Sequence, residues 1–382
     1  MTAHHYGKSR PGRNTDTPVR GSGDALTHAL GRLLDPASGP AEQRAAARVL
    51  DRAQTTALST LPLHRALGHR VRRLLRPAPG QRLLARLLAS GPAAEAARAL
   101  ALAPGLEPLP AGAPRLQQVP LRLLRAPGPS VAVRQGRLGD CWLIAVLDAC
   151  EAIRPGFLRE LIRPDADPRF ATVRLHSPAL ALPLLRRIPG LPLRPREVRL
   201  STAVPRDRRA GSRTLAPNAA SLAEKAAVCL WAQGSYRRLA RDFAGIAFVL
   251  VTGRWAPARP VPRRLETMER WLAQGRPVVA STLIRPGGSF TLAREDDPGR
   301  RVAVMDGHVY AVHGVGHSDE DGRAVAGAPL RVHLRNPVGP ADPPAPSSRG
   351  MGESVVRRKD LYLSARQLRR AFISVNVGPR LR

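Results

Sequence analysis

Hydrophobic residues follow a helical period in the first part of the chain. Between residues 24 and 104, Ala and Leu recur every three to four positions, which is the spacing of an amphipathic helix. Pro and Gly interrupt this stretch, so it predicts several short helices, at 24–34, 41–57, 64–76, 80–89 and 92–102. The polar start, 1–23, predicts a disordered tail, and the Pro- and Gly-rich stretch 105–130 predicts a linker.

The pattern changes from residue 131 onward. A helix is predicted at 142–152, a Pro- and Arg-rich stretch follows, and another helix is predicted near 219–242. The last third alternates apolar and polar positions, which predicts strands at 277–284, 301–306, 309–315, 329–335 and 371–377. Helices first and strands second indicate an α+β protein with two lobes, preceded by the all-α N-terminal region 24–104, whose role is left open.

Composition excludes several classes of protein. Of the 382 residues, 43% are hydrophobic, which is too many for a fully disordered chain and enough for one large core or two moderate ones. No uncharged apolar run approaches 18 residues, so no membrane span is expected. No apolar segment follows the early basic residues, so no Sec-type signal peptide is expected. Three cysteines suit a reducing compartment, and we expect a cytoplasmic protein.

The net charge of +32 first suggests a nucleic-acid or anionic-surface partner. The charge is spread evenly, however, with +11 on residues 1–124 and +21 on the remaining 258. The densest basic run, 186–213, has few aromatic residues on which bases could stack. We therefore interpret the charge as a general preference for arginine and consider nucleic-acid binding the weaker hypothesis.

The most informative segment surrounds Cys141. Asp140 is a good helix N-cap, and Cys141 then falls in the first turn of an apolar helix, where free N–H groups and the helix dipole lower a thiol pKa. Gln135, six residues earlier, offers an amide donor for an oxyanion hole. We expect Cys141 to be a nucleophile rather than an ordinary buried thiol. Cys150 and Cys229 are expected to be core residues.

A thiol nucleophile needs a base and a group that orients the base. His308 opens an alternating strand, and a second strand ends in Asn336. If the two strands pair around the acidic turn at Gly322, His308 and Asn336 come side by side, and the Asn side chain can fix the imidazole tautomer. His313 and His333 are expected to be strand positions farther along the ladder. No Cys/His spacing supports zinc.

Three segments together resemble the signature boxes of calpains. They are the cysteine box Gln135-Gly136-x-x-Gly139-Asp140-Cys141-Trp142, the histidine box Gly307-His308-x-Tyr310-x-Val312-x-Gly314-Val315, and the asparagine box Leu334-Arg335-Asn336-Pro337-x-Gly339. The resemblance covers about 131–378. It implies a papain-like two-lobed protease core, with a helical Cys lobe at 131–255 and a β-rich His/Asn lobe at 256–378.

The resemblance also implies an activity, that of a cysteine endopeptidase acting on protein or peptide substrates. Cys141 attacks the peptide carbonyl, His308 transfers the proton, and Asn336 orients His308. Gln135 and the backbone N–H of Cys141 bind the oxyanion. Gly253 is a weak match to a substrate-pairing glycine, because Arg254 stands where the family has a second Gly.

Other departures from the family pattern concern activity and calcium. Val338 stands where the asparagine box usually has a Trp that shields the Asn–His hydrogen bond. No EF-hand loop is present, and calcium is left open as a cofactor. Two acidic clusters in turn-like segments are weak calcium candidates, with solvated turn acids as the alternative. They are Glu295, Asp296 and Asp297, and Asp319, Glu320 and Asp321.

Three alternatives to an active protease stay open. The chain could be a catalytically weak or inactive binding protein that keeps the protease fold, which Val338 and Arg254 suggest. It could be a basic protein that binds nucleic acid or an anionic surface, with an incidental cysteine. A transglutaminase-like acyl transferase shares the Cys and His, but Asn336 favours hydrolysis over that reading. The substrate and the oligomeric state are not predicted.

Overall fold

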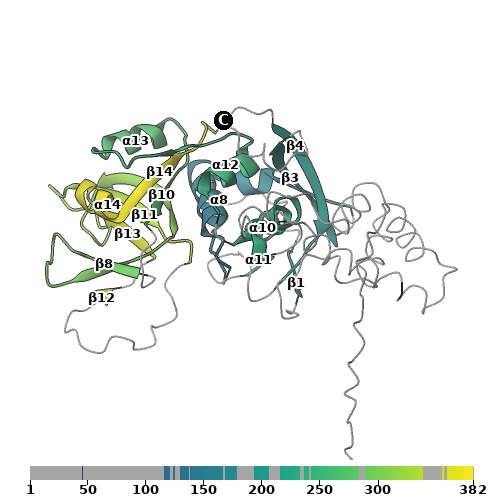
Figure 1. Cartoon of the computed structure of the whole chain (residues 1–382), viewed down its shortest axis with the longest axis horizontal. Helices are drawn as coiled ribbons and strands as arrows, with labels where there is room; N and C mark the ends of the chain where they lie inside the picture. Colours follow the sequence, from purple (N-terminus) through teal and green to yellow (C-terminus); the bar gives the residue numbers. More distant parts are fainter. Residues whose placement is uncertain are drawn as a thin grey trace, which may run out of the picture.

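Figure 1 shows the chain as a computed structural model. The structure describes residues 116–120, 130–136, 138–166, 168–178, 193–205, 216–232, 236–240, 242–283, 289–338, 355–356 and 359–381, with the single positions 45 and 124. The predicted tail, most of the predicted linker and, apart from position 45, the predicted N-terminal helices lie outside these residues. The described part contains both helices and sheets, which confirms a mixed α+β fold.

Helices dominate the first half of the described chain. They are α8 (Cys141–Ile153), α9 (Phe157–Glu160), α10 (Ala219–Leu230), α11 (Tyr236–Leu239) and α12 (Ala244–Thr252). The prediction at 142–152 is confirmed by α8. The single helix expected near 219–242 is two helices, since α10 ends at Leu230 and α11 begins at Tyr236. Gly234 lies between them in the sequence, and glycine disfavours helix continuation.

An antiparallel sheet that was not predicted accompanies these helices. Its order is β2 (Ile162–Pro164), β3 (Phe170–Pro178) and β4 (Leu193–Ser201). In β3, Val173 and Leu175 are buried whereas Arg174 between them is exposed. A small second sheet pairs β1 (Leu116–Gln118) with β5 (Ala203–Pro205). The half that contains Cys141 is therefore not purely helical.

The strands predicted in the last third are all present. A six-stranded antiparallel sheet has the order β13 (Asp360–Leu363), β11 (Leu330–Arg335), β10 (Val309–His317), β7 (Val278–Thr282), β14 (Phe372–Val377) and β6 (Ala258–Arg259). A three-stranded sheet comprises β12 (Val355–Val356), β9 (Arg301–Met305) and β8 (Ser289–Ala293). Helices α13 (Glu266–Ala273) and α14 (Ala365–Ala371) pack on the larger sheet.

Two hydrophobic cores share strand β10. The first core draws on residues between Val119 and Ala256 and takes Val309 and Ala311 from β10. The second draws on residues between Leu265 and Val377 and takes Tyr310 and Val312 from the same strand. Because successive strand residues point to opposite faces, β10 presents one face to each core.

Helix α8 lies against the face of β10 that carries Val309 and Ala311. It contacts β10, β7 and α12, and Figure 1 shows it between the six-stranded sheet and the β3–β4 pair. This packing brings the start of α8, where Cys141 lies, close to the start of β10, which follows His308.

No helix among the described residues is long and apolar enough to span a membrane.

Candidate active site

Cys141 is the first residue of α8, as predicted. The helix begins there because the backbone carbonyl of Asp140 accepts hydrogen bonds from the N–H groups of Leu143 and Ile144 at 2.9 and 3.2 Å. The carboxyl of Asp140 makes no capping hydrogen bond, however, so the predicted side-chain N-cap is wrong. Asp140 ends the loop through its backbone alone.

The carboxyl of Asp140 is instead fully buried beside Gln135 and Glu224. Burial raises the pKa of Asp140 to about 6, and the neighbouring Glu224 and Gln135 side chains oppose this rise. Glu224 comes from α10 and is also fully buried. Two buried carboxyls in contact favour keeping one proton between them, because two adjacent negative charges are costly away from water.

The thiol of Cys141 is protonated at neutral pH in this structure. Burial raises its pKa to about 11, the charge of Asp140 adds to the rise, and the backbone N–H of Val309 opposes it. The sequence predicted the opposite direction from the helix N-terminus, but desolvation outweighs the helix dipole here. The Val309 contact places Cys141 beside the residue that follows His308.

His308 is hydrogen-bonded to Asn336, with 2.9 Å between Nε2 and Oδ1. The antiparallel pairing of β10 with β11, which are joined by a segment that includes Gly322, accompanies this contact. The register differs from the predicted one, because Ala311 pairs with Arg335, so Asn336 is not directly opposite His308. The backbone of His308 is fixed by Thr282, whose hydroxyl accepts from the His308 N–H at 2.9 Å. Burial lowers the pKa of His308 to about 4, and the Asn336 hydrogen bond opposes this shift, so the imidazole is neutral at pH 7.

The orientation of the Asn336 amide decides the tautomer of His308. Oδ1 of Asn336 also accepts from the backbone N–H of Val338 at 3.0 Å, and Nδ2 donates to Sδ of Met305 at 3.4 Å. The atom that faces His308 is therefore an acceptor, and Nε2 must carry the proton. Nδ1 of the neutral imidazole then has a free lone pair and can accept a proton from a thiol.

Two hydrogen bonds between distant segments of the chain bring Gln135 next to the residues that follow Asn336. The Gln135 N–H donates to the carbonyl of Pro337 at 2.7 Å, and Nε of Arg134 donates to the carbonyl of Val338 at 3.1 Å. The segment before Cys141 is thereby joined to the segment after Asn336. Gln135, Cys141, His308 and Asn336 are each less than a tenth exposed.

The side chain of Gln135 is held within its own loop. Its Nε2 donates to the carbonyl of Leu138, and its Oε1 is buried with no hydrogen-bond partner among the described residues. The amide keeps a second N–H, which is the group an oxyanion would need. The role of Gln135 as an oxyanion donor stays a prediction.

Gly253 has a clear role in the fold. It follows the last turn of α12 with a left-handed backbone (φ 72°), and a Cβ at this position would lie 2.6 Å from the His176 ring. Both features require glycine. A substrate contact at Gly253 stays a prediction.

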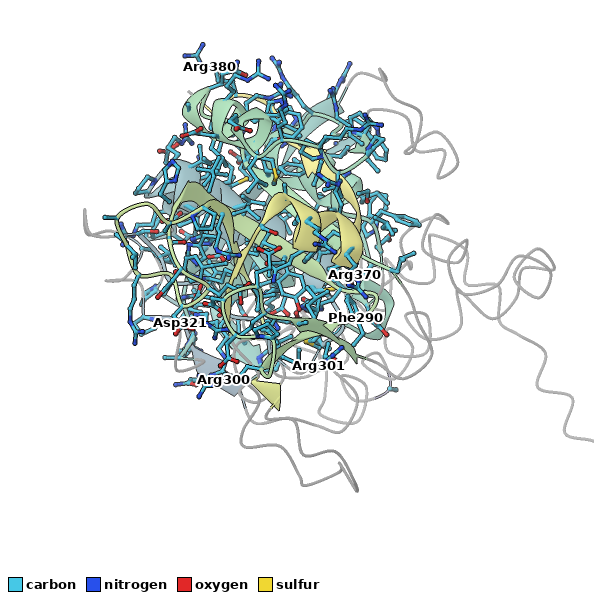
Figure 2. The ribbon with its side chains drawn as sticks, turned by 90° about the vertical axis from the view of Figure 1, so that its left-hand side faces the viewer. Phe290, Arg300, Arg301, Asp321, Arg370 and Arg380 are labelled. Carbon is cyan, nitrogen blue, oxygen red and sulfur yellow. The ribbon has the colours of Figure 1, made fainter. Side chains whose placement is uncertain are left out.

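Five of the six acidic residues named as calcium candidates form ion pairs with arginines, and the sixth, Asp319, accepts from the backbone N–H groups of Asp321 and Arg323. Asp296 binds Arg294 with both oxygens, at 2.8 and 2.7 Å, and this holds the pKa of Asp296 well below its usual range. The remaining ion pairs of the group are Arg294–Glu320, Arg294–Asp321, Arg323–Asp321, Arg331–Glu295, Arg331–Glu320 and Arg300–Asp297. Figure 2 shows Asp321 and Arg300 toward the same end of the molecule. Within the described ranges no group of three or more His, Cys, Asp or Glu residues is arranged to hold a metal ion.

The other cysteines and histidines take structural positions. Cys150 is fully buried in α8, which raises the pKa of its thiol. Cys229 is half-buried at the end of α10 rather than in the core. His313 and His333 are strand residues of β10 and β11, as predicted. Sequence reasoning missed Thr282, Met305 and Pro337, since a side chain or carbonyl at a strand end carries no recognisable signal.

Comparison with known proteins adds no family assignment. No protein-family model matches this chain, and a search of the curated proteins finds no match. The likeness to calpains rests on the three sequence segments described above. What the site can do is therefore argued from its own residues: a thiol at a helix start, a neutral imidazole, an amide that orients it, and a second amide in the preceding loop.

Proposed function

We propose that this chain is a cysteine endopeptidase of the calpain type, with Cys141, His308 and Asn336 as its catalytic group. The observation that carries the proposal is the 2.9 Å hydrogen bond from His308 to Asn336 at the point where the backbone of Val309 meets Cys141. Three distant segments supply these residues, and their side chains are of the types that a nucleophile, a base and an orienter require. Protein or peptide chains are the proposed substrates.

The reaction starts from a neutral thiol and a neutral imidazole. As the sulfur of Cys141 attacks the peptide carbonyl carbon, its proton passes to Nδ1 of His308, and the carbonyl oxygen becomes an oxyanion. The backbone N–H of Cys141 and the free N–H of Gln135 stabilise this oxyanion. When the C–N bond breaks, His308 returns the proton to the leaving amine. Water then attacks the thioester, giving one proton to His308, and release of the acid restores the thiol.

Asn336 contributes by holding the imidazole in one tautomer. With Nε2–H bound to Asn336, the lone pair of Nδ1 is directed away from Asn336 and is available to the thiol. The hydrogen bond strengthens as His308 becomes positively charged, because charge-assisted hydrogen bonds are stronger than neutral ones. The same bond therefore both orients the base and stabilises its charged form.

A second candidate is a protein that binds peptides without cleaving them. It is favoured by the burial of Cys141, which raises the pKa of the thiol to about 11. A substrate must reach a sulfur atom that is less than a tenth exposed, so binding has to uncover the site. Retention of the full biological effect by Cys141→Ala would favour this candidate over the endopeptidase.

The proposed test is covalent labelling followed by peptide mapping. An epoxysuccinyl inhibitor should modify Cys141 and leave Cys150 and Cys229 unmodified, which provides an internal control in the same chain. Casein should be cleaved by the native chain and not by Cys141→Ala. Absence of a Cys141 adduct in the folded protein, both with calcium and with a chelator, would refute the proposal.

A cytoplasmic location and the lobe boundaries at 131–255 and 256–378 belong to the same proposal. The two hydrophobic cores support a division into two lobes, since the second draws on residues between Leu265 and Val377, whereas the first draws mainly on residues between Val119 and Ala256 and adds Val279, Val309 and Ala311 from the strand-rich part. Calcium is left open as an activator, and the two labelling conditions address it directly.

A further inference from the structure

Asp148 and His313 join the two elements that carry the proposed nucleophile and base. Oδ2 of Asp148, in α8, lies 2.8 Å from Nε2 of His313, in β10. Only 4% of the Asp148 side chain and 13% of the His313 side chain are exposed. The contact spans 165 residues of sequence and connects the first hydrophobic core to the central strand of the six-stranded sheet.

The sequence of α8 marks Asp148 as unusual. From Cys141 to Cys150, every residue except Asp148 is hydrophobic, and the whole stretch is buried. A carboxylate in such a position is retained only where a partner compensates for the loss of water. His313 provides that partner.

A bulge in β10 falls at His313, on the face of the strand that meets α8. The pairing of β10 with β11 shifts register between Val312 and Gly314, so His313 is the extra residue. Before the bulge, Val309 and Ala311 already face the core that contains α8. Bulges redirect side chains and are frequent near active sites. His313 thus continues the face of β10 that meets α8.

Helix α8 and strand β10 therefore touch at two separate points. The first is Cys141 against the backbone N–H of Val309, and the second is Asp148 against His313. Seven helical residues rise about 10 Å, and four strand residues rise about 13 Å, so the two elements run side by side over a similar length. Packing against β7 and α12 also holds the helix, and the Asp148–His313 bond adds a polar tie in its second half.

We propose that Asp148 and His313 are positioning residues that set the distance between the sulfur of Cys141 and the imidazole of His308. The inference rests on the proposed function. Neither residue touches the reacting atoms, and both act through the elements that carry them. A displacement of about 1 Å between reacting groups lowers the rate of an enzyme roughly 100-fold. Loss of the Asp148–His313 hydrogen bond in the second half of α8 should therefore lower kcat measurably.

The chain offers a matched control pair in His333 and Asp360. Nε2 of His333 lies 2.8 Å from Oδ1 of Asp360, the same separation as in the Asp148–His313 pair. Both control residues belong to the six-stranded sheet, in β11 and β13, and neither contacts α8 through this bond. The pair is more exposed, with 35% of the Asp360 side chain accessible, Asp360 also accepts from Arg335 at 3.1 Å, and the His333 ring lies 5.4 Å from that of His313. Loss of this pair removes a neighbouring His–Asp hydrogen bond and keeps the one that reaches α8.

The test compares Asp148→Ala, Asp148→Asn and Asp360→Ala in the full chain, with casein hydrolysis normalised by active-site titration of Cys141. We expect Asp148→Ala to lower kcat by roughly 10- to 100-fold with KM changed less than about threefold. Asp148→Asn keeps an acceptor for Nε2–H and should retain most of kcat. Asp360→Ala should change the melting temperature but keep kcat within about twofold.

Two outcomes would overturn the inference, and they are distinguishable. If the native chain shows no turnover beyond that of Cys141→Ala, the proposed function fails and the positioning role fails with it. If the native chain turns over and Asp148→Ala keeps kcat within about twofold, the positioning role alone fails. If Asp148→Ala does not fold, His313→Ala is the second variant. It leaves the sequence of α8 unchanged and is expected to give the same loss of kcat.

Discussion

Nε2 of His308 lies 2.9 Å from Oδ1 of Asn336, and the orientation of the Asn336 amide makes the imidazole the donor. Met305 and the backbone of Val338 hold the amide in this orientation. The bond therefore selects one tautomer of a buried, neutral imidazole, and its loss should affect catalysis more than folding.

Replacing Asn336 with Ala should reduce casein hydrolysis roughly 10- to 100-fold, because the imidazole can then rotate and change tautomer. The measurement is kcat/KM over a pH series, with melting temperature recorded for each protein. Asn376→Ala is the matched control, since Asn376 is an equally buried asparagine whose Nδ2 donates to the Ala256 carbonyl at 2.8 Å. Equal activities of the two variants would contradict the orienting role.

The strand-rich part was predictable because β9 alternates buried and partly exposed residues, β7 and β10 are short apolar runs, and Gly322 supplies a left-handed turn (φ 81°) between β10 and β11. The sheet of β2, β3 and β4 was missed because arginine occupies outward positions such as Arg174, and the pattern suggested an irregular basic stretch. The alternation of apolar and polar residues indicates the buried face of a strand only where the outward positions do not repeat a single residue type such as arginine.

The residue types of the candidate site were predictable, whereas their electrostatics were not. The sequence indicated a lowered thiol pKa at Cys141, but burial raises it, and burial depends on packing between distant segments. Asp148 is visible in the sequence as a single charge in an apolar run. Its partner, His313, lies 165 residues away and is itself the extra residue of a bulge, which no local sequence pattern predicts.

Acid should destabilise the protein through His308. Burial lowers its pKa to about 4, against 6.5 for a free imidazole, so between these values the unfolded chain binds a proton that the folded chain does not. Stability due to this group is complete above pH 6.5 and is lost as the pH falls toward 4, by roughly 3 kcal/mol. Urea unfolding of the native chain and His308→Gln at pH 7 and pH 4 measures the difference, and parallel losses in both proteins would contradict it.

Gly253→Ala should destabilise the fold by more than a simple left-handed residue does. The alanine must adopt a positive φ, and its Cβ would lie 2.6 Å from the His176 ring. We therefore expect the free energy of unfolding to fall by about 2 to 4 kcal/mol. Gly156→Ala is the control, because Gly156 has φ 92° but no atom within 4 Å of a Cβ, and about 1 kcal/mol is expected there. Denaturant unfolding gives both values.

The outcome for Gly253 also bears on substrate binding. If its role is limited to the end of α12, the folded fraction of Gly253→Ala should cleave casein with an unchanged KM. A raised KM in protein that is fully folded would support the substrate contact that the sequence suggested. Equal destabilisation by the two glycine substitutions would contradict the contact with His176.

Arg294 should stabilise the strand-rich part in the way a bound cation could. Its side chain is 7% exposed and contacts Asp296, Glu320 and Asp321, so Arg294→Met removes a cation from the buried Glu320 and from the partly exposed Asp296 and Asp321 and should cost about 2 to 4 kcal/mol. Arg300→Met is the control, since Arg300 is 55% exposed and 3.5 Å from Asp297, and a change within about 0.5 kcal/mol is expected. Because the guanidinium already neutralises these acids, calcium and a chelator should give the native chain the same melting temperature. The contrary result is a melting temperature that rises by several degrees when calcium is added to the native chain but not when it is added to Arg294→Met. It would show that calcium binds beside Arg294, so that the arginine does not take the place of a calcium ion.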